Sequence, residues 1–133
     1  RGELFDSSGL TEVERLREED PFTETLADVA PTRIVGHRSR FEVDLNRPRD
    51  QCVYLTPEEA WGLNVWREPL APDAVEESRR LHDLFYGAIG GLVRQLVAVH
   101  GRVIVLDVHS YNHRRGGPDG PAANENDNPE IGR

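Results

Sequence analysis

Residues 107–110, with the sequence Asp-Val-His-Ser, combine side-chain types that suit chemistry with a favourable position in the chain. The apolar run 103–106 precedes them and is typical of a strand buried on both faces. A histidine fixed directly after such a strand is well placed to ligate a metal ion, and a carboxylate such as Asp107 can orient its ring. The alternative is a strand end followed by a surface histidine.

Residues 39–48, with the sequence Ser-Arg-Phe-Glu-Val-Asp-Leu-Asn-Arg-Pro, place basic and amide groups at both ends of an alternating segment. Arg40 precedes the alternation, and Asn46 and Arg47 follow it. Guanidinium groups bind carboxylates through two parallel hydrogen bonds, so this set suits a substrate carboxylate. Salt bridges within an acidic protein are the alternative interpretation.

Residues 17–20 form a third polar group, Arg-Glu-Glu-Asp, at the expected end of a helix. A carboxylate run there usually forms a solvated face or a helix cap, and we prefer that interpretation for Glu18. Glu19 or Asp20 could instead turn inward as an oxygen ligand of zinc, whose sites mix histidine and carboxylate.

Residues 109–115 crowd histidine, tyrosine, asparagine and arginine side chains, including Arg114, into one short segment. They form either a substrate-contact loop or a mobile surface segment. The remaining histidines have no partners at ligand spacing, and we interpret them as structural or exposed: His37, His82 and His100. Cys52 lies in no recognisable nucleophile context.

Composition limits the class of protein. The 133 residues fit one domain, and 16 basic against 24 acidic residues give a net charge of −8. An acidic balance argues against a general nucleic-acid binder. No run approaches the roughly 18 apolar residues of a membrane span, and the sequence contains no basic-then-apolar segment typical of a signal peptide. A single cysteine excludes an internal disulfide. We therefore expect a cytoplasmic protein that binds neither nucleic acid nor membrane.

Several local patterns predict helices that position these groups. Thr11 and Glu14 form a capping-box pattern for a helix that ends near Asp20. Asp20 and Pro21 are typical of the start of a second, short helix. The sequence Thr-Pro-Glu-Glu at 56–59 predicts a third start, and apolar residues at three- and four-residue intervals predict a long helix over 73–97.

Four segments predict strands: 34–35, 41–45, 53–55 and 102–108. Together with the helices they indicate an α/β fold, a mixed sheet flanked by helices. Ligands bind beyond the carboxyl ends of strands in such folds, which is where residues 44–47 and 107–110 fall. We expect one domain over 1–133, with 114–133 as a loop or tail.

The order of these motifs resembles the N-formylglutamate amidohydrolase family over about 12–113. The resemblance is carried by residues 39–48, by residues 107–110 and, more weakly, by Glu19 and Asp20. That family is similar in fold to the zinc carboxypeptidases and the aspartoacylase group. The resemblance implies a phosphorylase/hydrolase-like zinc carboxypeptidase fold, incomplete in this chain, which is either a fragment of a longer metallohydrolase domain or a reduced relative.

The resemblance also implies a function. It predicts a zinc-dependent amidohydrolase that cleaves the amide of an N-acyl acidic amino acid with metal-activated water. His109 would ligate zinc together with Glu19 or Asp20, and the substrate carboxylates would be bound by basic and amide side chains: Arg40, Asn46, Arg47 and Arg114. The alternative is a catalytically inactive carboxylate-binding domain of the same fold. The general base and the oligomeric state stay open.

Overall fold

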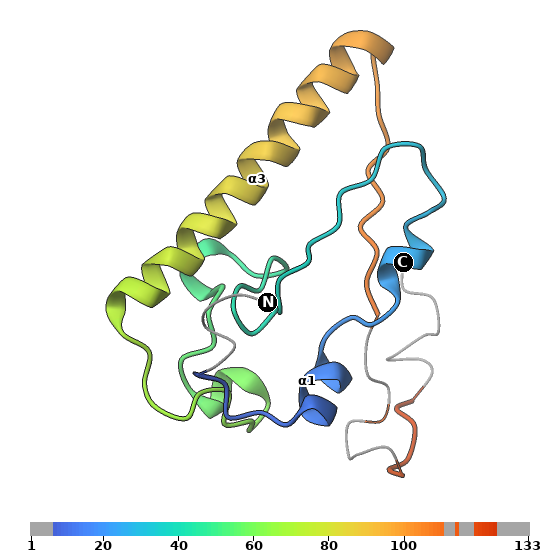
Figure 1. The fold of residues 1–133 in the computed structure, drawn as a ribbon. Helices are drawn as coiled ribbons and strands as arrows, with labels where there is room; N and C mark the ends of the chain where they lie inside the picture. The colour runs from blue at the N-terminus through green and yellow to red at the C-terminus, as the bar shows by residue number, and fades with distance from the viewer. Residues whose placement is uncertain (1–6, 111–113, 115–118, 125–133) are drawn as a thin grey trace.

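The longest element is helix α3, Pro72–His100, in a computed structural model that describes residues 7–110, 114 and 119–124. Pro72 stands in the first turn, where its missing N–H costs nothing. The helix ends at Gly101, whose φ of 76° is a conformation that glycine adopts readily. The prediction of a long helix is confirmed, with ends a few residues outside the expected range. Figure 1 shows α3 as a diagonal rod along one side of the molecule.

Two short helices precede α3. Helix α1, Glu12–Glu18, begins at the predicted capping box, since the Thr11 hydroxyl accepts from the Glu14 amide while the Glu14 carboxylate accepts from the Thr11 amide. Helix α2, Thr23–Leu26, begins later than expected because Phe22 adopts a left-handed conformation with a φ of 66°.

Two turns of 3-10 helix lie between α2 and α3. The first, η2, spans Arg49–Gln51. The second, η3, spans Pro57–Ala60 and begins at the predicted capping box of Thr56 and Glu59. Trp61 ends η3 with a φ of 55°, which reverses the chain.

The predicted α/β fold is wrong for the described residues, whose regular elements are helices and which contain no strand or sheet. Their one bridge is an isolated pairing of Ser8 with Trp66. A strand needs a neighbour that takes its backbone hydrogen bonds. At 41–45 the amides of Glu42 and Val43 instead bond back to the Ser39 carbonyl, which makes a turn.

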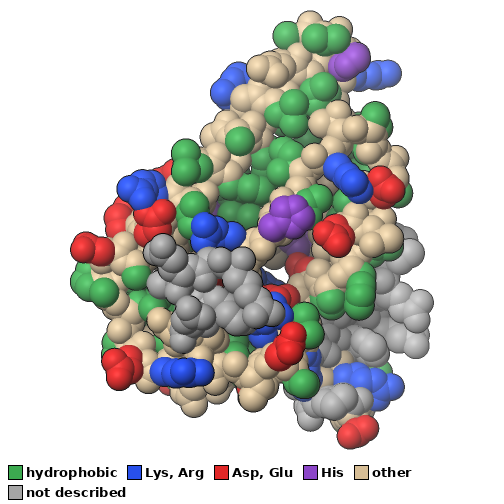
Figure 2. Space-filling view, in the orientation of Figure 1, with side chains coloured by type: hydrophobic (Ala, Val, Ile, Leu, Met, Phe, Trp, Pro, Cys, Tyr) green, Lys and Arg blue, Asp and Glu red, His purple; other side chains and the backbone are tan. Residues whose placement is uncertain are grey.

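The segment 102–108, expected as a strand covered on both faces, is exposed along most of its length. Ile104 is 90% exposed, and Val105 and Leu106 are each 65% exposed. In this structure its apolar side chains therefore do not belong to a strand that other elements cover on both faces. The segment runs back from the end of α3, and Figure 2 shows apolar side chains gathered between the two.

The core consists of two apolar clusters that share the segment 41–45. Phe41 packs with Tyr54, Ala60 and Val65 in the first cluster. The second cluster contains Val43, Cys52, Val53 and Val75.

Helix α3 enters the second cluster through Val75 and buries Ser78 and His82 on the same face. Only its N-terminal half is therefore anchored in the core. None of the helices in the described part of the chain combines the length and apolarity needed to cross a membrane.

Candidate functional site

Asp44 is the centre of the most connected polar group in the structure. Its side chain is buried, and its residue is 2% exposed. One carboxylate oxygen, Oδ2, accepts from the Tyr54 hydroxyl and from Arg40 Nη2 at 2.9 Å, and it lies 3.7 Å from Arg47 Nε. The other oxygen, Oδ1, accepts from the Asn46 amide at 2.9 Å. We call Arg40, Asp44, Arg47, Tyr54 and Trp61 the Asp44 cluster.

The local sequence explains why this carboxylate is fixed. Residues 39–45 form a turn followed by extended backbone, and the Asp44 amide donates to the Cys52 carbonyl at 2.7 Å. Phe41 and Val43 are buried in the two apolar clusters on either side. The side chain between these anchors cannot reach bulk water and must find its partners inside the protein.

Each of the two guanidinium groups lies over the face of an aromatic ring. The Arg47 guanidinium lies 4.2 Å from the centre of the Tyr54 ring, and that of Arg40 lies 5.2 Å from the Trp61 ring. Both distances are within the range of cation–π attraction. Arg47 also donates to the Glu59 carbonyl at 3.0 Å, and Arg40 donates to the Glu18 carbonyl at 2.8 Å.

The pKa values of the cluster follow from these contacts. Burial opposes ionisation of Asp44, but hydrogen bonds from Tyr54 and Arg40 outweigh it and lower the pKa of Asp44 below its usual value. Burial and the bond to Asp44 raise the pKa of Tyr54. The pKa of Arg40 is raised because Asp44 and Asp20 outweigh the effect of burial. The cluster therefore holds two cations, one carboxylate and one neutral phenol at neutral pH.

A second polar group surrounds His109, and we call Asp20, Asp107, His109 and Ser110 the His109 cluster. His109 Nδ1 lies 3.1 Å from Asp20 Oδ2, and its Nε2 lies 3.1 Å from Asp107 Oδ1. Ser110 donates to Asp20 Oδ1 at 3.4 Å. Burial alone would lower the pKa of His109, but the two carboxylates raise it.

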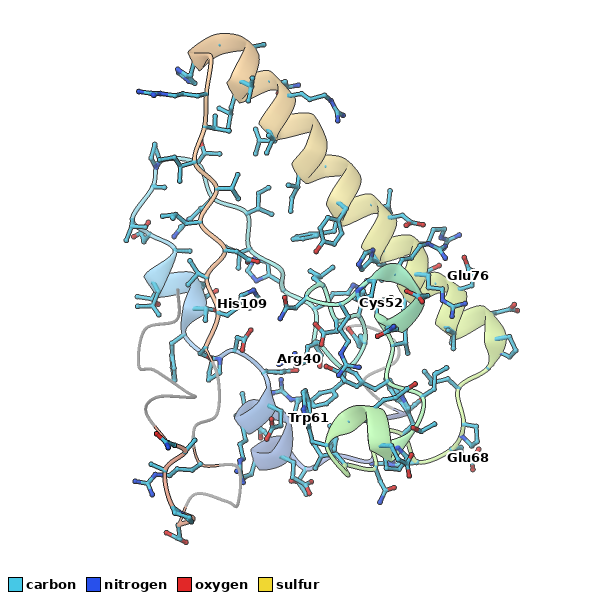
Figure 3. The ribbon with its side chains drawn as sticks, turned by 180° about the vertical axis from the view of Figure 1, so that it is seen from behind. Arg40, Cys52, Trp61, Glu68, Glu76 and His109 are labelled. Carbon is cyan, nitrogen blue, oxygen red and sulfur yellow. The ribbon has the colours of Figure 1, made fainter. Side chains whose placement is uncertain are left out.

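Arg40 links the two clusters. It contacts the Glu18 carbonyl at the end of α1, and the Asp20 charge acts on its guanidinium. Figure 3 shows Arg40 between His109, on the extended segment after α3, and Trp61 at the end of η3. Residues separated by as many as 90 positions are thus brought into one region by α1 and the segment that follows α3.

The other predicted site residues are placed differently. Glu19, which caps the C-terminus of α1, pairs with Arg15 of that helix, whereas Asp20 is the carboxylate beside His109. Asn46 is exposed and contributes its backbone amide to Asp44. Arg114 donates to the Gly120 carbonyl and accepts from Arg17, so these contacts connect it to α1. The rest of the expected loop, 111–113 and 115, lies outside the described residues.

Three residues of this region were missed by the sequence reasoning. Tyr54 was interpreted only as part of a strand, although a tyrosine in an apolar segment needs a partner for its hydroxyl, and that signal could have found it. Trp61 and His82 carried no such signal, because their roles depend on the path of the chain in space.

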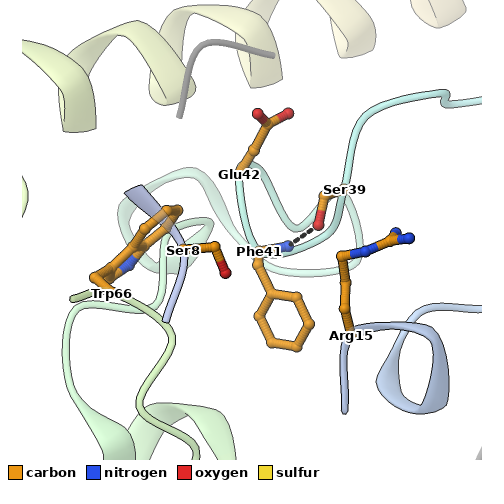
Figure 4. A pocket seen from close by; sticks show the side chains of 6 residues that line it. All are labelled: Ser8, Arg15, Ser39, Phe41, Glu42 and Trp66. Carbon is orange, nitrogen blue, oxygen red and sulfur yellow. Dashed lines mark hydrogen bonds between the residues drawn. The ribbon is translucent and has the colours of Figure 1, made fainter. Parts of the chain in front are cut away.

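The nearby hollow lined by residues 8, 15, 39, 41, 42 and 66 is too small for a substrate (Figure 4). Its volume of about 10 Å³ holds no more than about one water molecule. Ser39 lines it and fixes the turn by accepting from the Phe41 amide at 3.2 Å.

Comparisons with known proteins agree with the resemblance seen in the motifs. A family model described as N-formylglutamate amidohydrolase matches residues 2–132. A protein named N-formylglutamate deformylase, from Pseudomonas aeruginosa, is 31% identical over 94 residues. That match covers 62% of this chain and 35% of the relative, so it spans about a third of the relative's length. No solved structure matches the chain at a significant level.

Proposed function

The chain belongs to the N-formylglutamate amidohydrolase family, and we propose that its Asp44 cluster binds the carboxylates of an N-formylated acidic amino acid for hydrolysis of the formyl amide. Support comes from the family match, from the name of the bacterial relative and from the arginine geometry. The substrate is a small molecule with more negative charge than most amino acids.

The observation that carries the proposal is the pairing of two guanidinium groups around one buried carboxylate. Asp44 contacts both guanidinium groups, whereas Asp20 acts on that of Arg40, so Arg47 has more of its charge left for a ligand. The side chains of Arg40 and Arg47 are 22% and 26% exposed, so each presents an edge to solvent. The Nε atom of Arg40 is buried and has no hydrogen-bond partner within the described residues. An incoming carboxylate would meet groups that are already oriented, which reduces the entropy cost of binding.

The surroundings strengthen this electrostatic argument. The chain as a whole carries a net charge of −8, which repels anions. Selective binding of an acidic amino acid therefore needs a local concentration of positive charge. Tyr54 and Trp61 hold that charge in place without neutralising it.

Zinc stays a prediction of the family resemblance. His109 and Asp20 lie close together and could supply two donors, but both ring nitrogens of His109 already face carboxylates. Catalytic zinc takes three protein ligands and structural zinc takes four. No group of three or more such side chains among the described residues is arranged to hold a metal ion. The donor set therefore does not fit as it stands, and we derive no catalytic step through a metal.

The pairing of both His109 ring nitrogens with carboxylates favours a second candidate, a carboxylate-binding domain that does not hydrolyse its ligand. Both candidates require Arg40 and Arg47 to bind the same class of molecule. They differ in whether formate is released, so one binding measurement and one product measurement separate them.

The binding experiment is isothermal titration calorimetry with N-formyl-L-glutamate and N-formyl-L-glutamine. The glutamine derivative keeps the size and loses one charge, so we expect it to bind roughly 10- to 100-fold more weakly, the range of one charge-assisted hydrogen bond. Arg47→Lys keeps the charge but loses the planar fork, and we expect a similar loss. Arg33→Lys, in an exposed pair with Asp28, is the matched control. Equal affinity for the two ligands would disprove recognition of the side-chain carboxylate, because both molecules keep the α-carboxylate.

The product experiment measures formate released from N-formyl-L-glutamate, with and without added zinc. Formate production that is lost in Arg47→Lys supports the amidohydrolase. Binding without formate under both conditions supports the non-hydrolytic domain.

A further inference from the structure

We propose that His82 and Tyr86 of α3 are positioning residues that fix Arg47 for carboxylate binding. The proposal rests on the proposed function of the Asp44 cluster. Neither residue lies in a predicted motif, and neither touches the guanidinium group. They act on the backbone from which it extends.

The contacts are specific to the loop that follows Asp44. His82 Nε2 lies 2.9 Å from the Arg47 carbonyl, and the Tyr86 hydroxyl donates to the Leu45 carbonyl at 2.6 Å. Because a carbonyl can only accept, His82 must carry a proton on Nε2. The two contacts bracket Asn46 and Arg47, so one face of α3 holds the peptide group before Asn46 and the one after Arg47.

Helical spacing explains why these two side chains can act together. Residues four positions apart lie one above the other on the same face of a helix. The rings of His82 and Tyr86 contact each other, with centroids 4.6 Å apart, so each limits the motion of the other. His82 is 8% exposed and lies beyond Val75 and Ser78, which anchor the same face in the core.

The loop needs this support because it has no ladder of backbone hydrogen bonds. Residues 45–48 lie between the turn at Asp44 and the start of η2, outside any helix or strand. The Arg47 side chain is held by its contacts with Tyr54, Asp44 and the Glu59 carbonyl. Those contacts fix the guanidinium only while the backbone of Arg47 stays in place. Helix α3 thus holds the backbone on one side, and the Asp44 cluster holds the side chain on the other.

The test compares three variants of the full chain. His82→Phe keeps a ring against Tyr86 and removes the N–H donor, while His82→Gln restores a donor of similar reach. Asp83→Asn is the matched control, because it lies on the same helix and breaks a surface pair with Arg49 without touching either carbonyl. Circular dichroism confirms that each variant folds.

The first readout needs no ligand. The NMR signal of the Arg47 Nε–H group reports its position over the Tyr54 ring through the ring-current shift. We expect His82→Phe to move this signal toward that of a free arginine, while His82→Gln and Asp83→Asn leave it close to the parent position. An unmoved signal in a folded His82→Phe variant overturns the proposal. If that variant does not fold, Tyr86→Phe takes its place, because it removes only one oxygen at a half-exposed position. The shift of the Arg47 Nε–H signal is then measured in Tyr86→Phe.

The second readout is the dissociation constant for N-formyl-L-glutamate. We expect roughly tenfold weaker binding in His82→Phe and recovery to within about twofold in His82→Gln. Unchanged binding in His82→Phe would overturn the positioning role. If the parent chain itself does not bind the ligand, the proposed function fails, and the Arg47 signal alone decides whether α3 positions this residue.

Discussion

Asp44→Asn should destabilise the protein more than any other single isosteric change in the region. The substitution keeps the shape and leaves an amide oxygen to accept from the Asn46 amide. It removes the charge at the position where Tyr54, Arg40 and Arg47 converge. Removing one partner of a buried ion pair costs roughly 3–5 kcal/mol, since the remaining charges lose their compensation.

The structure places the expected cost at the lower end of that range. Both arginine side chains are about a quarter exposed, so water can solvate part of each charge after the substitution. We therefore expect a loss of about 3 kcal/mol in the free energy of unfolding. With a urea dependence of about 1.5 kcal/mol per molar, the unfolding midpoint should fall by about 2 M.

The assay is urea unfolding followed by circular dichroism at pH 7, with Asp50→Asn as the control. Asp50 is an exposed carboxylate of η2, and its substitution should change stability by less than about 0.5 kcal/mol. If Asp44→Asn lies within that same margin, the cluster does not stabilise the fold and the reasoning is refuted.

The pH dependence provides an independent check on the same carboxylate. The pKa of Asp44 is lower in the folded protein than in the unfolded chain. Its contribution is therefore fully present above the unfolded pKa of about 3.9 and is lost as the pH falls through the folded pKa. The stability difference between the parent and Asp44→Asn should be constant from pH 5 to 7, on the order of the value above, and should shrink in acid below about pH 4. A difference that grows in acid would contradict the lowered pKa.

Three further changes test the packing around the site. Gly9→Ala should lower stability by roughly 1–3 kcal/mol in thermal unfolding, because its Cβ would lie 2.7 Å from the Asn64 carbonyl oxygen; an unchanged melting temperature would contradict this close approach. Val75→Ala should lower the free energy of unfolding in urea by about 2 kcal/mol, because two methyl groups are removed from the cluster that joins α3 to Val43. An unchanged free energy would show that α3 is not anchored there. Cys52 is fully buried, and burial raises the pKa of its thiol. A disulfide reagent should therefore react with this thiol only after the protein unfolds. Rapid reaction in native buffer would contradict its burial.

Local sequence chemistry correctly predicted the starts of several helices. The capping boxes at Thr11 and Thr56 are confirmed because their hydrogen bonds join residues three positions apart and need no tertiary partner. The long apolar periodicity before His100 predicted α3 for the same reason. The family was also predicted from the local motifs at 39–48 and 107–110, and the family model matches residues 2–132.

The strands could not be predicted in the same way. Alternation at 41–45 and the apolar run at 103–106 describe side chains that are suited to a sheet, but a sheet exists only where a second segment accepts the backbone hydrogen bonds. In this structure the amides of Glu42 and Val43 bond to the Ser39 carbonyl, and Ile104 is exposed.

The sequence by itself determined which groups this protein offers for binding an anion: two arginines and an aspartate within eight positions, in a chain that matches a family of amidohydrolases. Only the tertiary structure decided how they are used. Burial of Asp44 between two apolar clusters forces the carboxylate to bind Arg40 and Tyr54, and His82 reaches the Arg47 carbonyl from 35 positions away. Such contacts form because an unpaired charge or carbonyl is costly in the desolvated interior. Which distant segments meet there is not encoded in any local sequence pattern.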